Sequence, residues 1–124
     1  MRRRAWLIGA LLLAAVPLGS DAALACKCAL VQRAQVVAAT PVVFEGEIVA
    51  VKAAGAGRQL TALRVTQAIK GTTAGETITV LTRTSAPACG WDFRQSPRRL
   101  VVGGDPAGTG RLSARRCTLY NLNR

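Results

Sequence analysis

This sequence has no histidine, and only six of its 124 residues are acidic. Histidine is the most frequent general base of enzymes and the commonest metal ligand, so the usual forms of both kinds of site are missing. Glu45 and Glu47 alternate along one extended segment, which is typical of a solvated strand face, and no nucleophile–base pair is evident. The sequence therefore predicts a protein that is not an enzyme and carries no cofactor.

Aromatic residues are also scarce, at 4% of the chain. Proteins that bind single-stranded nucleic acid stack the bases on aromatic side chains that follow one another along a strand. The aromatic residues beyond residue 25 form no such series: they are Phe44, Trp91, Phe93 and Tyr120. The sequence therefore does not favour nucleic acid as a partner.

The chain lacks an apolar run of about 20 residues, the length that a membrane-spanning helix needs. Its longest apolar run covers residues 5–16 and follows the three arginines at positions 2–4. Pro17 ends the run, and Ala23-Leu24-Ala25 offers the small residues that a signal peptidase accepts. We therefore predict a signal peptide over residues 1–25, a single domain over residues 26–124, and export to the extracellular space or the periplasm.

Three other interpretations of this segment stay open. An uncleaved segment would anchor the chain in a membrane. Arg3 and Arg4 faintly resemble a twin-arginine export signal, although the strongly apolar run fits the general secretory route better. The stretch from Ala23 to Cys26 resembles a lipoprotein cleavage box, and lipidation of Cys26 would tie the protein to a membrane and remove both its thiol and its free amine.

Four cysteines all lie beyond residue 25: Cys26, Cys28, Cys89 and Cys117. An even number in a small exported domain predicts two disulfides. A bridge between Cys26 and Cys28 would be strained, so each of them is expected to pair with Cys89 or Cys117, and both arrangements stay open. Each bridge would close a loop of more than about 50 residues and contribute about 3–5 kcal/mol to stability. The lack of histidine and of a C-x-x-C motif argues against a structural metal site.

Basic residues outnumber acidic ones by 14 to 5 beyond residue 25, a net charge of +9. This excess predicts affinity for polyanions such as acidic glycans or an anionic membrane surface. A merely solvated surface is the alternative, because most of the charges are spread along the chain. The tightest clusters, which we expect to form a basic patch, are Arg98 with Arg99 and Arg111 with Arg115 and Arg116.

Hydrophobic periodicity predicts one helix over residues 29–39, which Thr40 and Pro41 end. Gly46 predicts a bulge within the first strand, and residues 103–110 predict a turn. Alternating and β-branched residues predict five strands, over residues 42–51, 60–69, 76–82, 100–102 and 111–114. Five short strands and one helix predict a mainly β fold, a small barrel.

Several short motifs occur in a characteristic order. They are Cys26-Lys27-Cys28 directly after the cleavage site, Val43-Phe44-Glu45-Gly46-Glu47-Ile48, Ile69-Lys70-Gly71, Cys89-Gly90, Leu100-Val101-Val102 and Cys117-Thr118. In this order they resemble the tissue inhibitor of metalloproteinases and netrin-like superfamily, in its shorter bacterial form. The likeness runs through nearly all of residues 26–124.

The resemblance implies a five-stranded oligonucleotide/oligosaccharide-binding barrel of Greek-key type and the pairings Cys26–Cys89 and Cys28–Cys117. It also implies that the α-amine and carbonyl oxygen of Cys26 bind the catalytic zinc of a metallopeptidase, and that Lys27 enters the pocket beside that zinc. The remaining contact residues would be Cys28, Ala29 and Leu30 along the peptidase cleft, and Ser85, Ala86, Pro87 and Ala88 as a neighbouring ridge. Animal members carry a small hydroxyl residue at the position of Lys27, and a lysine there needs an acidic partner.

Two functions from different classes follow. The first is inhibition of a zinc metallopeptidase through Cys26. The second is a non-inhibitory binding module at the cell surface or in the matrix, which uses its basic surface to bind an acidic glycan or a protein and is tethered to a membrane only if Cys26 is lipidated. In either case we expect a monomer.

Overall fold

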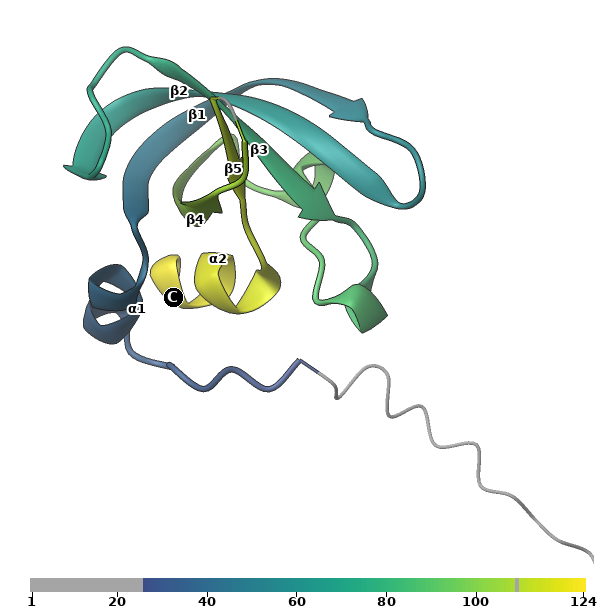
Figure 1. Cartoon of the computed structure of the whole chain (residues 1–124), viewed down its shortest axis with the longest axis horizontal. Coiled ribbons are helices and arrows are strands. Elements are labelled where there is room, and N and C mark those ends of the chain that lie inside the picture. Colours follow the sequence, from purple (N-terminus) through teal and green to yellow (C-terminus); the bar gives the residue numbers. More distant parts are fainter. Residues whose placement is uncertain (1–25, 109) are drawn as a thin grey trace, which may run out of the picture.

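The computed structural model describes residues 26–108 and 110–124 (Figure 1). The predicted signal peptide, residues 1–25, lies outside the described residues. The fold class predicted from the sequence is confirmed: the chain is mainly β and forms a closed five-stranded barrel, joined by two short α-helices.

Five strands form the barrel in the order β1-β2-β3-β5-β4, and β4 closes it against β1. Strands β3 and β5 pair in parallel and all other neighbours pair antiparallel. The bounds are Val42–Ala53 for β1, Arg58–Lys70 for β2, Thr77–Arg83 for β3, Arg99–Pro106 for β4 and Arg111–Ser113 for β5.

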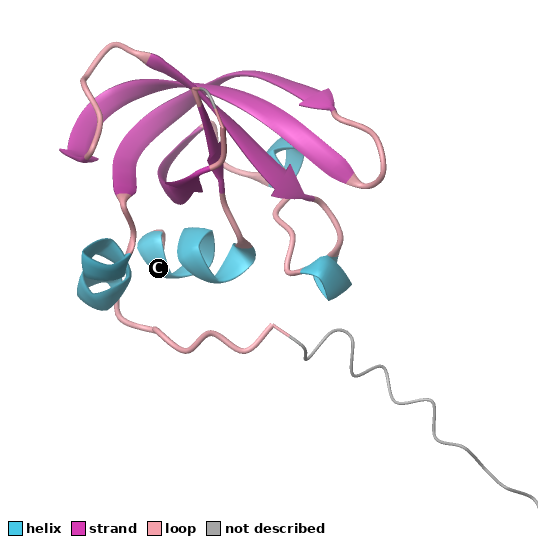
Figure 2. Cartoon of the chain, viewed as in Figure 1, coloured by secondary structure: helices cyan, strands magenta, loops and turns pink. Residues whose placement is uncertain are grey.

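Two helices lie side by side under one end of the barrel, α1 over Arg33–Ala39 and α2 over Arg116–Leu122 (Figures 1 and 2). The 3-10 turns η2, Ala86–Ala88, and η3, Phe93–Gln95, lie between β3 and β4. Lys70 ends β2 and donates hydrogen bonds of 3.1 Å to the carbonyl oxygens of Val37 and Ala38, so it caps the last turn of α1.

Two apolar clusters hold these layers together. The larger fills the barrel and consists of Phe44, Leu63, Val65, Val80, Phe93, Leu100, Val102, Leu112, Ala114 and Leu119. The smaller joins Val36 of α1, Val43 of β1 and Leu122 of α2. Neighbouring residues of a strand point to opposite faces. Phe44 therefore packs in the larger cluster and Val43 in the smaller one.

The predicted bulge at Gly46 is confirmed by a register shift between Glu45 and Gly46 in the β1–β2 pairing. A Cβ atom at Gly46 would lie 2.7 Å from the ring of Phe44. The absence of a side chain therefore lets the Phe44 ring lie across the strand inside the barrel.

Most predicted strand bounds differ from the structure by one or two residues, and three differences are larger. The first helix begins at Arg33 and not at residue 29, because the disulfide of Cys28 holds the preceding residues in an extended path. Strand β4 continues to Pro106, through part of the predicted turn, because Gly103 and Gly104 pair with β1. Helix α2, which contains Cys117, was not predicted.

Candidate functional site

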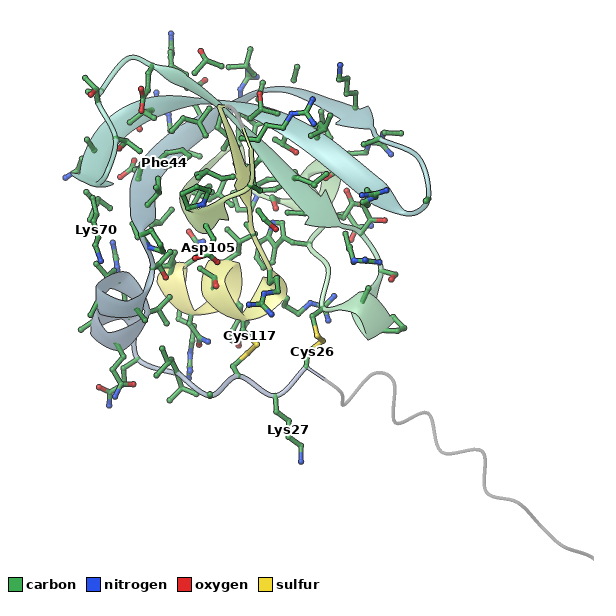
Figure 3. All side chains as sticks on the ribbon, viewed as in Figure 1. Cys26, Lys27, Phe44, Lys70, Asp105 and Cys117 are labelled. Carbon is green, nitrogen blue, oxygen red and sulfur yellow. A yellow bond between two sulfur atoms is a disulfide. The ribbon has the colours of Figure 1, made fainter. Side chains whose placement is uncertain are left out.

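The N-terminal edge, residues 26–30, is an extended segment that runs below α2 (Figures 1 and 3). Cys26 is bonded to Cys89 and Cys28 to Cys117, with Cα–Cα distances of 5.4 and 5.2 Å. These are the two pairings that the family resemblance implied. Two bridges within three residues leave the edge little freedom to move relative to the barrel.

A third attachment comes from Asn121, which is 2% exposed. Its side-chain nitrogen donates hydrogen bonds to the carbonyl oxygens of Leu30, at 3.0 Å, and Cys117, at 2.9 Å. The edge is therefore fixed at Cys26, Cys28 and Leu30, while the lysine between the two cysteines is exposed and points away from the barrel (Figure 3).

The ridge, residues 85–88, lies next to the edge. The Cys26 sulfur is 3.4 Å from the carbonyl oxygen of Ala86, and η2 ends at Cys89, which has a positive φ of 54°. Ser85, Ala86 and Pro87 are exposed, and Ala88 is half-buried. The structure thus brings together two predicted contact segments that lie more than 50 residues apart in the sequence.

Gly90 allows the ridge to fold back on itself. Its N–H donates to the Ser85 carbonyl oxygen at 2.9 Å, and the next residue, Trp91, donates to the Arg83 carbonyl oxygen at 2.6 Å. A Cβ atom at Gly90 would collide with the Arg83 carbonyl oxygen and lie 2.7 Å from that of Ser85. This position therefore requires glycine.

Helix α2 supports both halves of the site. Arg116, its first residue, donates from its backbone N–H to the Cys89 carbonyl oxygen at 2.9 Å and from Nε to that of Gly90 at 3.0 Å. Cys117 and Asn121 of the same helix hold the edge. One short helix therefore sets the distance between edge and ridge.

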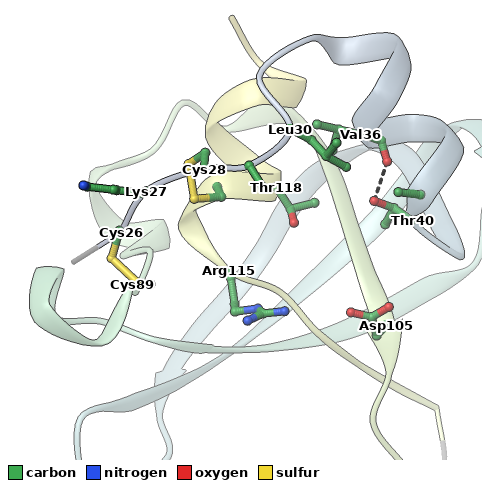
Figure 4. A pocket seen from close by; sticks show the side chains of 13 residues that line it. Cys26, Lys27, Cys28, Leu30, Val36, Thr40, Cys89, Asp105, Arg115 and Thr118 are labelled. Atoms are coloured by element: carbon green, nitrogen blue, oxygen red, sulfur yellow. Dashed lines mark hydrogen bonds between the residues drawn. A yellow bond between two sulfur atoms is a disulfide. The ribbon is translucent and has the colours of Figure 1, made fainter. Parts of the chain in front are cut away.

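An open cleft of about 470 Å³ lies between the edge, the two helices and the end of β4 (Figure 4). Figure 4 shows Asp105 of β4 and Arg115 on the same side of this cleft, and the Thr40 hydroxyl donating to the Val36 carbonyl oxygen at 2.6 Å. The sequence gives no sign that Asp105, Thr40 or Asn121 adjoins this site, because an isolated polar residue carries no signal of its place in the fold.

The turn that follows the ridge is held by a buried amide. Gln59, which is 1% exposed, donates from Nε2 to Asp92 Oδ1 at 2.9 Å and accepts from the Phe93 N–H at 2.8 Å. The hydrogen bond from Gln59 and a second from the Arg94 N–H, also 2.9 Å, lower the pKa of Asp92. The ionised carboxylate therefore stabilises this turn.

The five arginines predicted as a basic patch do not lie together. Arg98 and Arg99 stand at the start of β4, where they pair with Glu47 at 3.3 and 3.7 Å. Arg115 lines the cleft and Arg116 holds the ridge, at the other end of β4. Arg111 begins β5 and is exposed. Only Arg115 and Arg116 adjoin the edge and the ridge.

Within residues 26–108 and 110–124, no three His, Cys, Asp or Glu side chains cluster in a way that could hold a metal ion. In the same part of the chain, no helix has the length and apolar character needed to cross a membrane. No protein-family model and no curated protein matches this chain.

Proposed function

We propose that the protein is exported, is cleaved before Cys26, and inhibits zinc metallopeptidases through the N-terminal edge. The observation that carries the proposal is the double disulfide anchorage of an exposed, extended segment that would begin with the α-amine of Cys26. The two disulfides are consistent with an extracellular location, because such bonds persist in oxidising compartments.

The amine and the carbonyl oxygen of Cys26 would chelate the catalytic zinc of the peptidase. An α-amine has a pKa of about 7.7–8.0, so part of it is neutral at pH 7 and zinc displaces the remaining proton. The chelate would occupy the position that a catalytic zinc keeps for water. Anchorage by two bridges and by Asn121 would lower the entropy lost on binding.

The exposed Lys27 side chain supports a specific class of target. It points away from the barrel (Figure 3), and it would enter the pocket next to the zinc. An ammonium group is costly to bury without a carboxylate. The preferred target is therefore a peptidase with an acidic residue in that pocket, and the ridge would contact the rim of its cleft.

The test compares two forms of the protein, one that begins at Cys26 and one with a single alanine before it. Both are made with the two disulfides intact and are assayed against a panel of zinc endopeptidases that includes members with an acidic pocket. We expect inhibition by the first form and a loss of at least about a hundredfold in the second, since the extra residue turns the amine into an amide that cannot bind zinc.

A serine endopeptidase is the control and should be unaffected by either form. Equal inhibition by the two forms would contradict the chelation mechanism. The absence of inhibition across the panel would contradict the proposed function itself.

A further inference from the structure

Three exposed arginines, Arg58, Arg83 and Arg115, line one cleft at the surface of the molecule. Arg58 of β2 is the direct cross-strand partner of Arg83 of β3. Leu81 of β3 pairs with Ser113, the last residue of β5. Arg115 follows two residues later, at the start of α2, and lines the same cleft as Arg58 and Arg83. All three side chains are exposed, whereas Gln59, Thr82 and Ala114, which adjoin them in the sequence, are buried.

These arginines border a cleft of about 230 Å³, which we call the arginine cleft. Leu81, Ala114 and Ser113 contribute to its walls, and Ala88 and Cys89 connect it to the ridge. No acidic and no aromatic residue lines it. Its positive charge is therefore not balanced from within the cleft.

A second cluster of three arginines gives a direct comparison. Arg64, Arg98 and Arg99 converge on the carboxylate of Glu47, at 3.2, 3.3 and 3.7 Å. In the described ranges, 26–108 and 110–124, Glu47 is the only carboxylate within 4 Å of an arginine or lysine side-chain nitrogen. One cluster thus carries its own counter-charge and the arginine cleft does not.

Like charges on directly opposed strand positions cost stability, and an anion placed between them removes that cost. Guanidinium groups match the oxygens of sulfate and phosphate with paired hydrogen bonds. We propose that the arginine cleft binds the sulfate groups of an acidic polysaccharide. A nucleic acid is the weaker fit, because bases need aromatic side chains to stack on and the cleft has none.

This site goes beyond the proposed inhibitory function, and its ligand has no need of the Cys26 amine. It adjoins the ridge through Ala88 and Cys89, so a polysaccharide chain would run alongside the segment that is proposed to contact the peptidase. Binding to a polysaccharide would then hold the inhibitor where peptidases act on the same matrix.

Calorimetric titration with heparin, a sulfated polysaccharide, tests this proposal. The variant R58Q/R83Q/R115Q is compared with R64Q/R98Q/R99Q, which loses the same charge from the cluster around Glu47. Glutamine keeps most of the aliphatic stem, and the intact mass and the thermal unfolding curve establish that both variants are folded. Measurements at about 50 and 150 mM salt give the electrostatic contribution to the free energy of binding.

We expect the first variant to lose at least about tenfold in affinity at low salt. The plot of log K against log salt should also become less steep, by about 2 in the magnitude of its slope. The second variant should change by less than about threefold, because its three arginines already converge on the Glu47 carboxylate and are not free to gather around a sulfate group. Equal losses in both variants, or no binding of heparin by the unaltered protein, would overturn the site. Tighter binding of a single-stranded oligonucleotide of equal length would overturn the ligand class.

The form with an alanine before Cys26 separates the two proposals. It should bind heparin as the unextended protein does while it fails to inhibit. A parallel loss of heparin binding in this form would show that the anion binds at the N-terminal edge, which would overturn the arginine cleft as the site.

Discussion

Asn121 is the residue on which the N-terminal edge depends most after its disulfides. Its amide is buried in α2 and donates both of its hydrogen bonds to carbonyl oxygens, one in the edge and one in the helix. An asparagine in a C-terminal stretch gives no hint in the sequence of a partner 91 residues away. This contact had to come from the structure.

Replacement of Asn121 by alanine should lower the free energy of unfolding by about 2 kcal/mol, since the buried amide and its two hydrogen bonds to carbonyl oxygens are lost. Urea denaturation measures the change. Tyr120→Ala serves as the control, because Tyr120 lies on the same helix but is 54% exposed, and this change should cost less than about 0.5 kcal/mol. Equal costs for the two variants would contradict the anchoring role of Asn121.

Asp92 should make stability depend on pH in the acid range. The hydrogen bonds from Gln59 and from the Arg94 N–H lower the pKa of Asp92 from its ordinary value of 3.8. The stability that this carboxylate contributes is therefore complete above its ordinary pKa and is lost as the pH falls through the lower pKa of the folded state.

The variant Asp92→Asn keeps an oxygen that accepts both hydrogen bonds but cannot ionise. Its free energy of unfolding should be lower than that of the unaltered protein at pH 6, and the difference should shrink as the pH falls below about 4. Denaturation curves at a series of pH values measure this. A difference that stays constant down to pH 2 would show that the charge of Asp92 contributes nothing.

At the scale of elements, the sequence predicted the strands and the bulge that depend on local residue patterns. It did not predict the helix that depends on contacts between distant residues. Alternation in residues 42–51 and 60–69 was sufficient to predict β1 and β2, and Gly46 marked the bulge between Glu45 and Gly46. Helix α2 was missed because seven residues are too few to form a stable helix alone. The disulfide of Cys117 and the burial of Leu119 and Leu122 hold it in place.

The candidate site shows the same division. Cys26 to Leu30 and the ridge were predicted from the family resemblance alone, and the structure brings them together. The cluster of Arg58, Arg83 and Arg115 was not predicted, because the pairing of β2 with β3 and the path from β5 into α2 bring these residues to one cleft. Arg98 and Arg99 do lie together around Glu47, but the five arginines expected to form a basic patch are divided between the two ends of β4.

Gly90, which follows the ridge, should tolerate an added methyl group poorly. Gly90→Ala would press its Cβ atom against the Arg83 and Ser85 carbonyl oxygens, and we expect a loss of about 2–3 kcal/mol in the free energy of unfolding. Ser85→Ala is the control: Ser85 is exposed and its side chain caps nothing, so it should cost less than about 0.5 kcal/mol. A thermal unfolding curve that is unchanged in Gly90→Ala would show that the chain tolerates a side chain at this position.

At the scale of the whole molecule, two long-range bridges join an N-terminal segment to a small barrel. Their sequence separations are 63 and 89 residues, so each on its own would stabilise the folded chain by about 4 kcal/mol through the entropy of loop closure. A domain of this size buries a limited apolar core, which makes such a contribution large. The same bridges fix the one segment that would present a free amine, so stability and the proposed activity depend on the same bonds.

The intact mass of the protein from its native host, with and without reduction, tests this account most directly. We predict an unmodified chain that begins at Cys26 and gains the mass of four hydrogens on reduction, two for each disulfide. A chain that retains residues before Cys26, or a Cys26 that carries a diacylglyceryl group, would contradict the account, because no free amine would then be available to bind zinc.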